Sequence, residues 1–205
     1  MRDAIGGPAF RNAESEVESR RGLGQGGDRG GSSRGFEVIT FERVGSAADP
    51  ILRNLYQLYI HDMSEWLGLD PEDDGRFAFD TAALWQGDVA VYLAHADRRL
   101  AGFGVVASAK PWLGREAARD VKDLFVLRRY RQQGVGRASA QHLWRQFPGE
   151  WLVRVLAANR PVVPFWRAAV REFTGSVFEE SAAQDRGRAW IHLRFDVLPP
   201  PAQDA

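Results

Sequence analysis

Residues 120–137 constrain the fold of this chain more than any other segment. An apolar run ends at Leu127, basic residues follow, and the spacing Arg131-x-x-Gly134-x-Gly136 leads into an amphipathic run. A short apolar run favours a buried strand, and apolar residues that recur every three to four positions favour a helix. Glycines between the two permit a tight turn. The segment therefore predicts a strand that turns directly into a helix, a connection typical of sheets covered by helices.

The rest of the chain alternates between strand and helix patterns in the same manner. A helix is expected to begin at Asp49-Pro50, an N-cap residue followed by proline at the first helical position, and to run to about Trp66. The predicted strands are residues 36–44, 89–94, 100–107, 121–127, 151–156, 177–180 and 189–195, and the further helices are residues 135–147 and 161–173. This alternation predicts one α/β (α+β) domain over residues 36–196, with a mixed central sheet of about six to seven strands flanked by helices.

The two ends of the chain differ from this pattern. Residues 1–35 hold nine glycines and six arginines and almost no large apolar side chains. Such a segment buries too little surface to offset the entropy of ordering it, so a disordered tail is expected. Residues 197–205 are expected to form a C-terminal tail. The sequence GLGQGG at residues 22–27 fits a dinucleotide-binding pattern, but no strand precedes it and no helix follows, so we interpret it as part of the first tail.

The composition argues against several classes of function. The 27 basic and 27 acidic residues give a net charge of zero, without the basic excess of a nucleic-acid-binding protein. There is no cysteine, and the histidines lack ligand spacing, so no metal site is expected. No apolar run approaches the ~18 residues of a membrane span. The N-terminus lacks the apolar stretch of a secretory signal. We expect a cytoplasmic protein that binds neither nucleic acid nor a membrane.

The turn after Leu127 has the chemistry of an anion site. The first turn of a helix carries backbone N–H groups without partners at the positive end of the helix dipole. Gly134 and Gly136 lack a Cβ atom, which lets an anion approach the backbone. Four arginines add positive charge, namely Arg128, Arg129, Arg131 and Arg137. The turn favours a pyrophosphate ligand; the alternative is a plain connection in which the glycines serve the turn alone.

This segment resembles motif A of the GNAT N-acetyltransferases, where Q/R-x-x-G-x-G/A follows a strand that ends in an apolar pair like Phe125-Val126. The order of the predicted elements over residues ~36 to 196 is also similar to that of the family. The resemblance implies acetyl-CoA as co-substrate, with loop amides on the pyrophosphate and strand main chain on the acetyl and pantetheine part. The cofactor-binding residues that it implies are Phe125, Val126, Leu127, Arg131, Gln132, Gln133, Gly134, Val135, Gly136, Arg137, Asn159, Phe165 and Trp166.

A second match lies downstream, where VRVLAAN at residues 153–159 and then Trp166 resemble motif B of the family. There the asparagine often contacts the pantetheine arm, and the aromatic position is commonly a tyrosine that protonates the departing CoA thiolate. An indole has no accessible acid dissociation, so Trp166 departs from this pattern. We expect the thiolate to take its proton from water or to leave as the anion. Phe165 and Trp166 are expected to pack on the cofactor, with packing in the core as the alternative.

Transfer to an amine requires the amine to be neutral, so a general base, or a water held by one, is expected near the acceptor. The candidates are Asp123 and Asp120, on the strand before the turn. Asp123 begins a sequence similar to the Asp/Glu-Phe-Phe-Val of the family, and Asp120 lies near where several relatives place a catalytic glutamate. Strand alternation predicts opposite faces for the two carboxylates unless a bulge intervenes. Either carboxylate could instead be solvated or salt-bridged.

The acceptor side is predicted at the end of the first helix and in the acidic loop of residues 68–80, which line this side in the family. The residues expected to contact the acceptor are Tyr59, Asp62, Glu65 and Trp66. The acidic loop would attract a cationic amine, and an ordinary exposed loop is the alternative. The acceptor is predicted to carry an amine, either as a small molecule or as a protein N-terminus or lysine. The sequence is compatible with a homodimer and does not define the oligomeric state.

The sequence thus predicts an acetyl-CoA-dependent N-acetyltransferase. The alternative is a module of the same fold that binds acyl-CoA as a sensor or interaction domain with weakened catalysis, which the missing tyrosine favours. An RNA-associated protein acting through its arginine- and glycine-rich segment is disfavoured, because that segment holds a single Arg-Gly-Gly unit and the net charge is zero.

Overall fold

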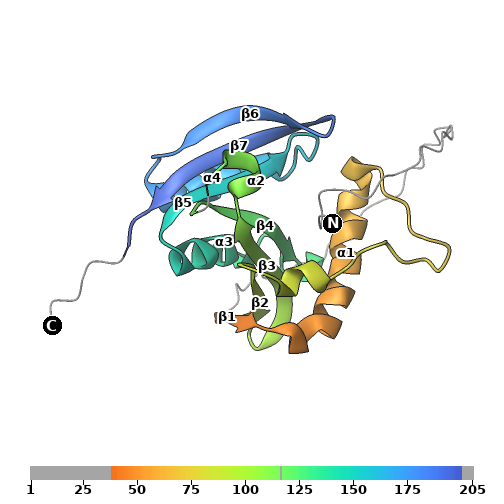
Figure 1. The fold of residues 1–205 in the computed structure, drawn as a ribbon. Coiled ribbons are helices and arrows are strands. Elements are labelled where there is room, and N and C mark those ends of the chain that lie inside the picture. The colour runs from red at the N-terminus through yellow and green to blue at the C-terminus, as the bar shows by residue number, and fades with distance from the viewer. Residues whose placement is uncertain (1–37, 116, 200–205) are drawn as a thin grey trace, which may run out of the picture.

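The computed structural model describes residues 38–115 and 117–199 and shows a seven-stranded sheet with helices packed on it (Figure 1). The strands are β1 (Ile39–Val44), β2 (Ala90–Ala96), β3 (Arg99–Ser108), β4 (Arg119–Val126), β5 (Gly149–Leu156), β6 (Glu179–Asp185) and β7 (Arg188–Val197). The α-helices are α1 (Asp49–Leu67), α2 (Lys110–Leu113), α3 (Val135–Gln146) and α4 (Val163–Thr174). The tail predicted for residues 1–35 lies outside the described residues. Of the tail predicted for residues 197–205, Val197 is the last residue of β7, and residues 200–205 also lie outside.

The sheet is mixed, as the sequence predicted. Its strand order is β1-β2-β3-β4-β5-β7-β6, with β4 and β5 parallel and every other neighbouring pair antiparallel. The predicted α/β domain with about seven strands and flanking helices is confirmed. The strand predicted over residues 177–180 is wrong in its bounds, because β6 spans Glu179–Asp185. Among the strands that the structure describes, this edge strand pairs with β7 alone, and it is mostly exposed. Its sequence therefore lacks the apolar pattern that would reveal it.

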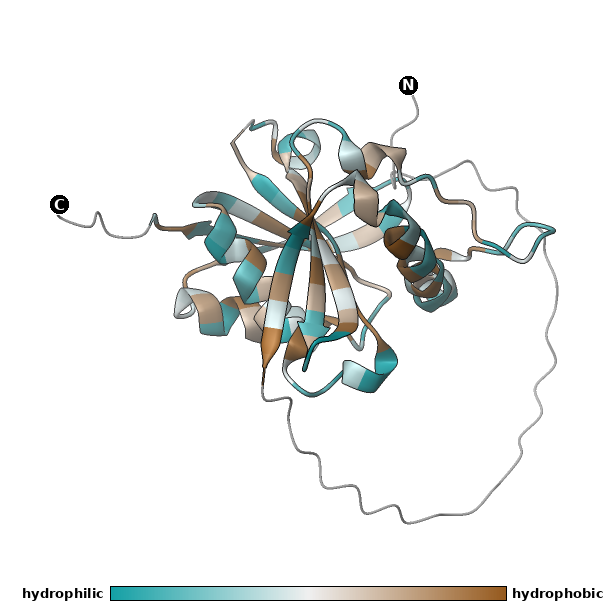
Figure 2. Cartoon of the chain, turned by 90° about the horizontal axis from the view of Figure 1, so that it is seen from below, coloured by the Kyte–Doolittle hydropathy of each residue, from teal (hydrophilic) through white to brown (hydrophobic). Residues whose placement is uncertain are grey.

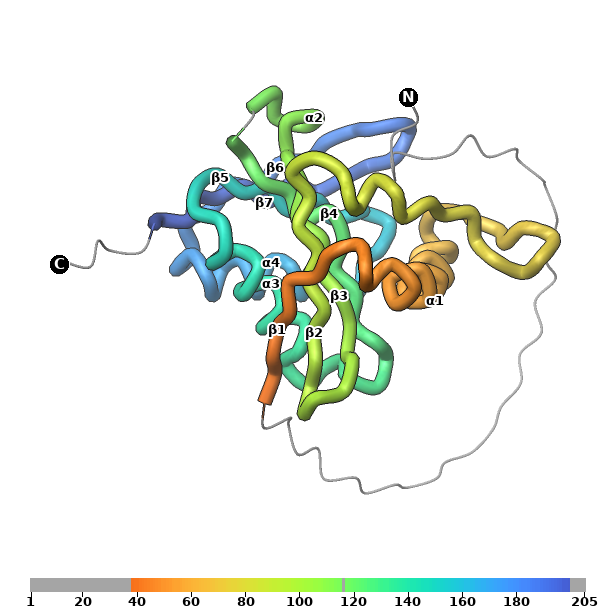
Figure 3. The backbone as a smooth tube through the Cα atoms, turned by 60° about the horizontal axis from the view of Figure 1, so that its bottom comes forward, coloured from red at the N-terminus to blue at the C-terminus, as the bar shows by residue number. Residues whose placement is uncertain are grey.

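Helix α1 covers one face of the sheet, and α3 and α4 cover the other (Figure 3). On the first face, Leu52, Tyr56 and Ile60 of α1 pack with Phe103 and Phe125. On the opposite face, α3, α4 and β5 contribute buried side chains to a second cluster: Leu143, Trp144, Trp151, Trp166 and Val170. Among the described residues no helix combines the length and apolarity needed to cross a membrane.

The bounds of α1 follow from local chemistry. Pro50 occupies the first turn, where a missing N–H costs nothing, and Gly68 ends the helix in the left-handed conformation at φ 62°. The loop that follows is hydrophilic and extends away from the sheet (Figure 2). Gln57 of α1 holds this loop by donating to the carbonyl of Phe77 at 3.0 Å and accepting from its N–H at 2.8 Å.

Strands β4 and β5 pair over only a short stretch. In the parallel pairing, Arg119 lies opposite Trp151 and Asp120 opposite Leu152, although β4 continues to Val126 and β5 to Leu156. Within the described residues the two strands therefore separate after Asp120. The sheet is divided into one part formed by β1 to β4 and a second part formed by β5, β7 and β6, which Figure 1 shows in its upper half.

The close approach of β3 and β4 makes a testable prediction. A Cβ atom at Gly102 would lie 2.1 Å from the carbonyl oxygen of Phe125, which is fixed backbone, so Gly102→Ala must displace β4. Its thermal unfolding should show a loss of stability of about 1–3 kcal/mol or more. A Cβ atom at Gly104 would meet the side chain of Leu143 at 2.8 Å, which can move, so Gly104→Ala is the milder control. Equal losses for the two variants would contradict this view of the strand contact.

Candidate functional site

A β-bulge places Asp120 and Asp123 on the same face of the sheet. Along β3 and β4, Val105 pairs with Asp123 and Val106 pairs with Val121, which leaves Lys122 as the extra residue. A bulge of one residue reverses the alternation of the side chains that follow it. Simple alternation would place the two carboxylates on opposite faces, but the prediction from the sequence made an exception for a bulge, and the bulge is present. Both carboxylates lie on the face that α1 covers.

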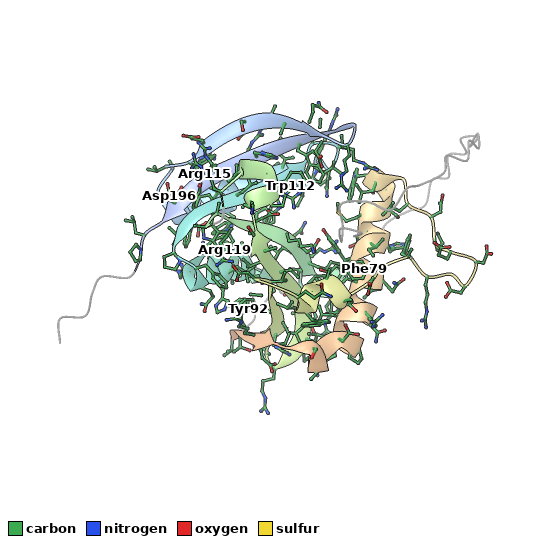
Figure 4. The ribbon with its side chains drawn as sticks, viewed as in Figure 1. Phe79, Tyr92, Trp112, Arg115, Arg119 and Asp196 are labelled. Atoms are coloured by element: carbon green, nitrogen blue, oxygen red, sulfur yellow. The ribbon has the colours of Figure 1, made fainter. Side chains whose placement is uncertain are left out.

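Asp123 is held by a tyrosine of α1. The hydroxyl of Tyr56 donates to Asp123 Oδ2 at 2.7 Å, and both residues are buried. Burial and the negative charge of Asp123 raise the pKa of Tyr56 well above its ordinary value, so the phenol stays a donor at neutral pH. The pKa of Tyr59 is raised by the same two causes. Phe79, which Figure 4 shows beside α1, stacks on Tyr56 with ring centres 3.9 Å apart.

Asp120 is bound by an arginine of β5. Arg154 donates to Asp120 Oδ2 through Nε at 2.9 Å and through Nη2 at 2.5 Å. The second oxygen, Oδ1, is buried and has no hydrogen-bond partner among the described residues. Burial raises the pKa of Asp120, and the Arg154 charge opposes that rise. One oxygen of Asp120 is thus anchored, and the other remains as an acceptor in a buried site.

The turn after β4 forms an open helix N-terminus. Residues Arg128–Tyr130 form a 3-10 turn, and Gly134 precedes α3 with φ 85°, a left-handed conformation that favours glycine. No side chain of the described residues caps the first turn of α3. A Cβ atom at Gly136 would lie 3.4 Å from the ring of Phe165 and 3.7 Å from Val126. The backbone of Gly136 thus lies beside Phe165 and the end of β4, where a Cβ atom alone would make ordinary van der Waals contacts.

Two arginines of this turn share one carboxylate of α1. Arg128 donates to Asp62 Oδ1 at 2.8 Å, and Arg131 donates to Asp62 Oδ2. Arg131 also donates to the carbonyl of Val126 at 2.7 Å, and its guanidinium lies over the ring of Phe125. These two cations lower the pKa of Asp62 against the opposing effect of its burial. Arg131 and Asp62, assigned from the sequence to different ligands, are therefore direct neighbours.

The remaining residues of the predicted cofactor site are distributed around this turn. Arg137 pairs with Glu172 of α4 at 3.0 Å, and the Gln133 side chain donates to the carbonyl of Arg129 at 2.7 Å. Val135 is buried, whereas Gln132, at φ 60°, is exposed. Leu127 is half-buried and bonds through its N–H to Ala101 at 2.9 Å.

The residues of the second predicted motif lie beyond β5. Asn159 is buried and donates to the sulfur of Met63 at 3.8 Å, so α1 reaches across from β4 to the end of β5. Trp166 is buried in the core beside Trp144, at a ring-centre distance of 6.4 Å, and also contacts Phe165. Core packing, the alternative considered for Trp166, is what the described contacts show, and Phe165 is the ring that lies next to Gly136.

The predicted acceptor residues are only partly brought together. Tyr59 is close to Asp123, and Asp62 binds the turn, whereas Glu65 is exposed and Trp66 is half-buried. The acidic residues of the following loop are exposed. Within residues 38–115 and 117–199, no group of three or more His, Cys, Asp or Glu side chains could hold a metal ion.

Sequence analysis missed Arg154 and its neighbours. The Arg154 guanidinium lies 4.1 Å from the ring centre of Trp112 in α2 and 5.6 Å from that of Trp190 in β7. Figure 4 shows Trp112 beside α2. One signal was present in the sequence, because Arg154 interrupts the otherwise apolar run of Trp151–Leu156. A charged residue inside a central strand is seldom buried without a partner.

Together these features place the N-terminal turn of α3 and a pair of buried carboxylates along β4, at the point where β4 and β5 separate. An anion at the N-terminus of α3 would face unpaired N–H groups. The carboxylates lie further back along β4, at the start of the opening. The arrangement can hold a phosphate-bearing ligand along β4 and can accept a proton from a group next to Asp120 or Asp123.

Comparison with models of protein families identifies the family of this chain. The model of the acetyltransferase (GNAT) family matches residues 52–169, more than half of the chain, and the chain belongs to this family. The resemblance inferred from motif A is thereby confirmed. A comparison with curated protein sequences finds no match.

Solved structures of acetyltransferases share the fold. The ribosomal-protein-S18-alanine N-acetyltransferase from Escherichia coli aligns with a TM-score of 0.53 at 14% identity, over 82% of this chain and 99% of that chain. An acetyltransferase of the GNAT family from Streptococcus pneumoniae aligns with a TM-score of 0.53 at 12% identity, over 78% and 99% of the respective chains. NAA60 from Arabidopsis thaliana, solved in complex with acetyl-CoA, aligns with a TM-score of 0.50 at 16% identity, over 78% and 98%.

The Tyr56–Asp123 hydrogen bond makes a second prediction. Tyr56→Phe removes the donor and leaves a buried carboxylate oxygen without it, so urea unfolding should show a loss of about 1.5–3 kcal/mol. Tyr92→Phe is the matched control, since Tyr92 is also buried and no carboxylate binds its hydroxyl in the described part of the chain. If both variants lose the same stability, the bond to Asp123 does not contribute as argued.

Proposed function

We propose that this protein is an N-acetyltransferase that moves the acetyl group of acetyl-CoA to an amine. The observation that carries the proposal is the placement of Asp120 and Asp123 on one face of β4, at the start of the opening between β4 and β5, with the uncapped N-terminus of α3 directly after the strand. Membership of the GNAT family supports the same reaction class.

The turn fits the pyrophosphate of acetyl-CoA. Gly134 adopts a backbone conformation that favours glycine, no side chain caps α3, and Gly136 leaves its backbone accessible beside Phe165. We assign the pyrophosphate to the amides of residues 132–137 and the pantetheine part to Asn159, Phe165 and the β4 main chain of residues 125–127. When bound, acetyl-CoA supplies an activated acetyl thioester. Arg131 would have to exchange its contact with Asp62 for a phosphate oxygen, or share the two.

Proton removal from the acceptor is assigned to Asp120. Its Oδ1 lacks a partner among the described residues, while its Oδ2 is fixed by Arg154. Burial raises the pKa of this carboxyl, which makes it a stronger base than an exposed aspartate. Asp120 takes the proton directly or through one bound water. Asp123, oriented by Tyr56, adds negative charge that favours a cationic acceptor at the same face.

The acceptor is assigned to the α1 side of this opening. Tyr59, Asp62, Glu65 and Trp66 lie on the α1 segment that leads from Asp123 towards the acidic loop. That loop would attract an ammonium group, whether of a small molecule, a protein N-terminus or a lysine.

The position that carries tyrosine in the family pattern supplies no acid to protonate the leaving thiolate here. Trp166 has no dissociable proton in the accessible range and is buried in the core. The thiolate is proposed to leave as the anion or to be protonated by water. This residue is also the observation that favours the second candidate, a module that binds acyl-CoA with weakened catalysis. Release of CoA in the presence of a panel of amines separates the two, because only the enzyme consumes acetyl-CoA.

The phosphate turn is tested by Gly136→Val. The added side chain would push against Phe165 and fill the space over the backbone amides. Calorimetry should show acetyl-CoA affinity weaker by about 10- to 100-fold or more, the equivalent of losing a charge-assisted hydrogen bond. Gly45→Val, where a Cβ atom meets nothing within 4 Å, is the control and should bind normally. Unchanged affinity in Gly136→Val would sink the assignment of this turn.

The base is tested by Asp120→Asn, which keeps size but cannot accept the proton. Turnover should fall by roughly 100-fold or more, the usual scale for losing a general base, with acetyl-CoA affinity unchanged. Asp123→Asn should lower turnover less, because Asp123 is assigned to charge and not to proton removal. The reverse order would move the base to Asp123. Full turnover in both variants would exclude both carboxylates.

A further inference from the structure

Arg154 has more contacts than its ion pair with Asp120. Its side chain is 11% exposed, and the carboxylate that it binds, Asp120, is 2% exposed. Two of its nitrogens, Nε and Nη2, donate to the same oxygen, Asp120 Oδ2. A guanidinium usually spreads such bonds over both oxygens of a carboxylate. Here the bond pattern fixes the carboxylate while it leaves Oδ1 without a partner in the described residues.

Two indole rings fix the guanidinium in turn. Trp112 reaches Arg154 from α2 at 4.1 Å, and Trp190 reaches it from β7 at 5.6 Å. Trp112 also packs against the small cluster that contains Leu152, the residue that pairs with Asp120. A planar guanidinium that stacks on aromatic rings loses little further freedom when it binds, whereas an ammonium group on a flexible chain cannot stack in this way. The elements α2, β5 and β7 therefore converge on one arginine.

We propose that Arg154 is a positioning residue that aims the free oxygen of Asp120 at the acceptor amine, and that Trp112 and Trp190 act through Arg154. The proposal rests on the proposed function, in which Asp120 removes the proton. Arg154 contributes in two separable ways. Its charge keeps the buried carboxylate ionised, and its stacked, forked geometry prevents the carboxylate from turning Oδ1 away.

Other charged and titratable groups also act on this carboxylate. They are Asp123 and Lys122 on β4, Tyr59 on α1, and His192, which pairs with Arg154 across β5 and β7. Asp123 opposes ionisation of Asp120, and Lys122 favours it less than Arg154 does. The pKa of His192 is lowered by burial and by the Arg154 charge, so this imidazole is neutral at neutral pH and adds no charge beside the pair. Arg154 is thus the main group that opposes the effect of burial.

The test uses three variants in the full chain. Arg154→Gln removes charge and geometry, Arg154→Lys keeps the charge alone, and Trp112→Leu keeps Arg154 but removes one ring. The control is Arg194→Gln, which breaks ion pairs with Glu179 and Glu150 on the neighbouring strands and does not touch Asp120. The readouts are the titration of Asp120 by NMR of 13C-labelled aspartate, identified by its loss in Asp120→Asn, and turnover at saturating acetyl-CoA.

In Arg154→Gln the carboxyl of Asp120 should titrate about 1–3 pH units higher than in the wild type, because the opposite charge that favoured the ionised form is gone. The acidic limb of kcat/KM for the acceptor should move in the same direction. Arg154→Lys should keep the titration within a few tenths of a unit of wild type but lose turnover by about tenfold or more, since about 1.4 kcal/mol of orientation is a factor of ten. Trp112→Leu should behave like Arg154→Lys with a smaller loss. Arg194→Gln should change neither readout.

Two results would overturn the proposal. An unchanged Asp120 titration in Arg154→Gln would remove the charge role, and full turnover in Arg154→Lys and Trp112→Leu would remove the positioning role. If Arg154→Gln does not fold, turnover of Trp112→Leu and Arg154→Lys still tests the positioning role. Both variants are expected to fold, because Trp112 is partly exposed and Arg154→Lys keeps the charge. A wild-type protein that releases no CoA with any amine contradicts the proposed function instead, and the titration remains a separate measurement on Arg154 and Asp120.

Discussion

Strands β4 and β5 stop pairing after Asp120 and Leu152, and the other features of the site depend on this separation. Main-chain groups inside a sheet normally bond to the neighbouring strand, so two buried strands that diverge must be held by other contacts. Helix α1 provides them on one face, through Tyr56 to Asp123 and through Met63 to Asn159. The ion pair between Asp120 and Arg154 spans the start of the opening. In the proposed function, acetyl-CoA would bind to strand main chain that a continuous sheet would pair.

The buried ion pair between Asp120 and Arg154 is better explained by the proposed proton transfer than by a contribution to folding stability. Removing a carboxylate and a guanidinium from water costs several kcal/mol per ion, and well-packed apolar side chains often replace such a pair without loss. Here one oxygen of Asp120 also lacks a partner among the described residues, which adds to the cost. A site that must accept a proton needs such an oxygen, since a fully bonded carboxylate is a weak base.

The two sides of the site are linked by charge. Asp62 of α1 binds Arg128 and Arg131 of the phosphate turn, so the helix assigned to the acceptor and the turn assigned to acetyl-CoA share one cluster. A phosphate at the turn would compete with Asp62 for these arginines. Trp166 takes no part in this network, because it packs into the core with Trp144 on the other face of the sheet.

Local patterns in the sequence were enough to predict most of the fold. The strand, the glycine turn and the helix between Asp120 and Gln146 follow from apolar spacing and glycine placement, which act within a few residues. The same holds for α1, with Pro50 at its start and Gly68 at its end. The edge strand β6 was misplaced because an exposed strand needs no apolar pattern. The proposal that this turn binds an anion also came from the sequence, since the chemistry of Gly134 and Gly136 is local.

The sequence alone left open how the acidic residues are arranged, and only the tertiary structure decided it. The bulge at Lys122 depends on the register of β4 against β3, which no residue of β4 encodes by itself, and it brings Asp120 and Asp123 to one face. The partner of Asp120 is Arg154, 34 positions further along the chain, because β4 and β5 become neighbours only when the sheet forms. By itself the sequence determined the family motif and the types and local spacing of the candidate side chains, since these are fixed by the chain. The folded sheet decided which of them meet, because contacts between distant strands depend on packing and pairing across the whole domain.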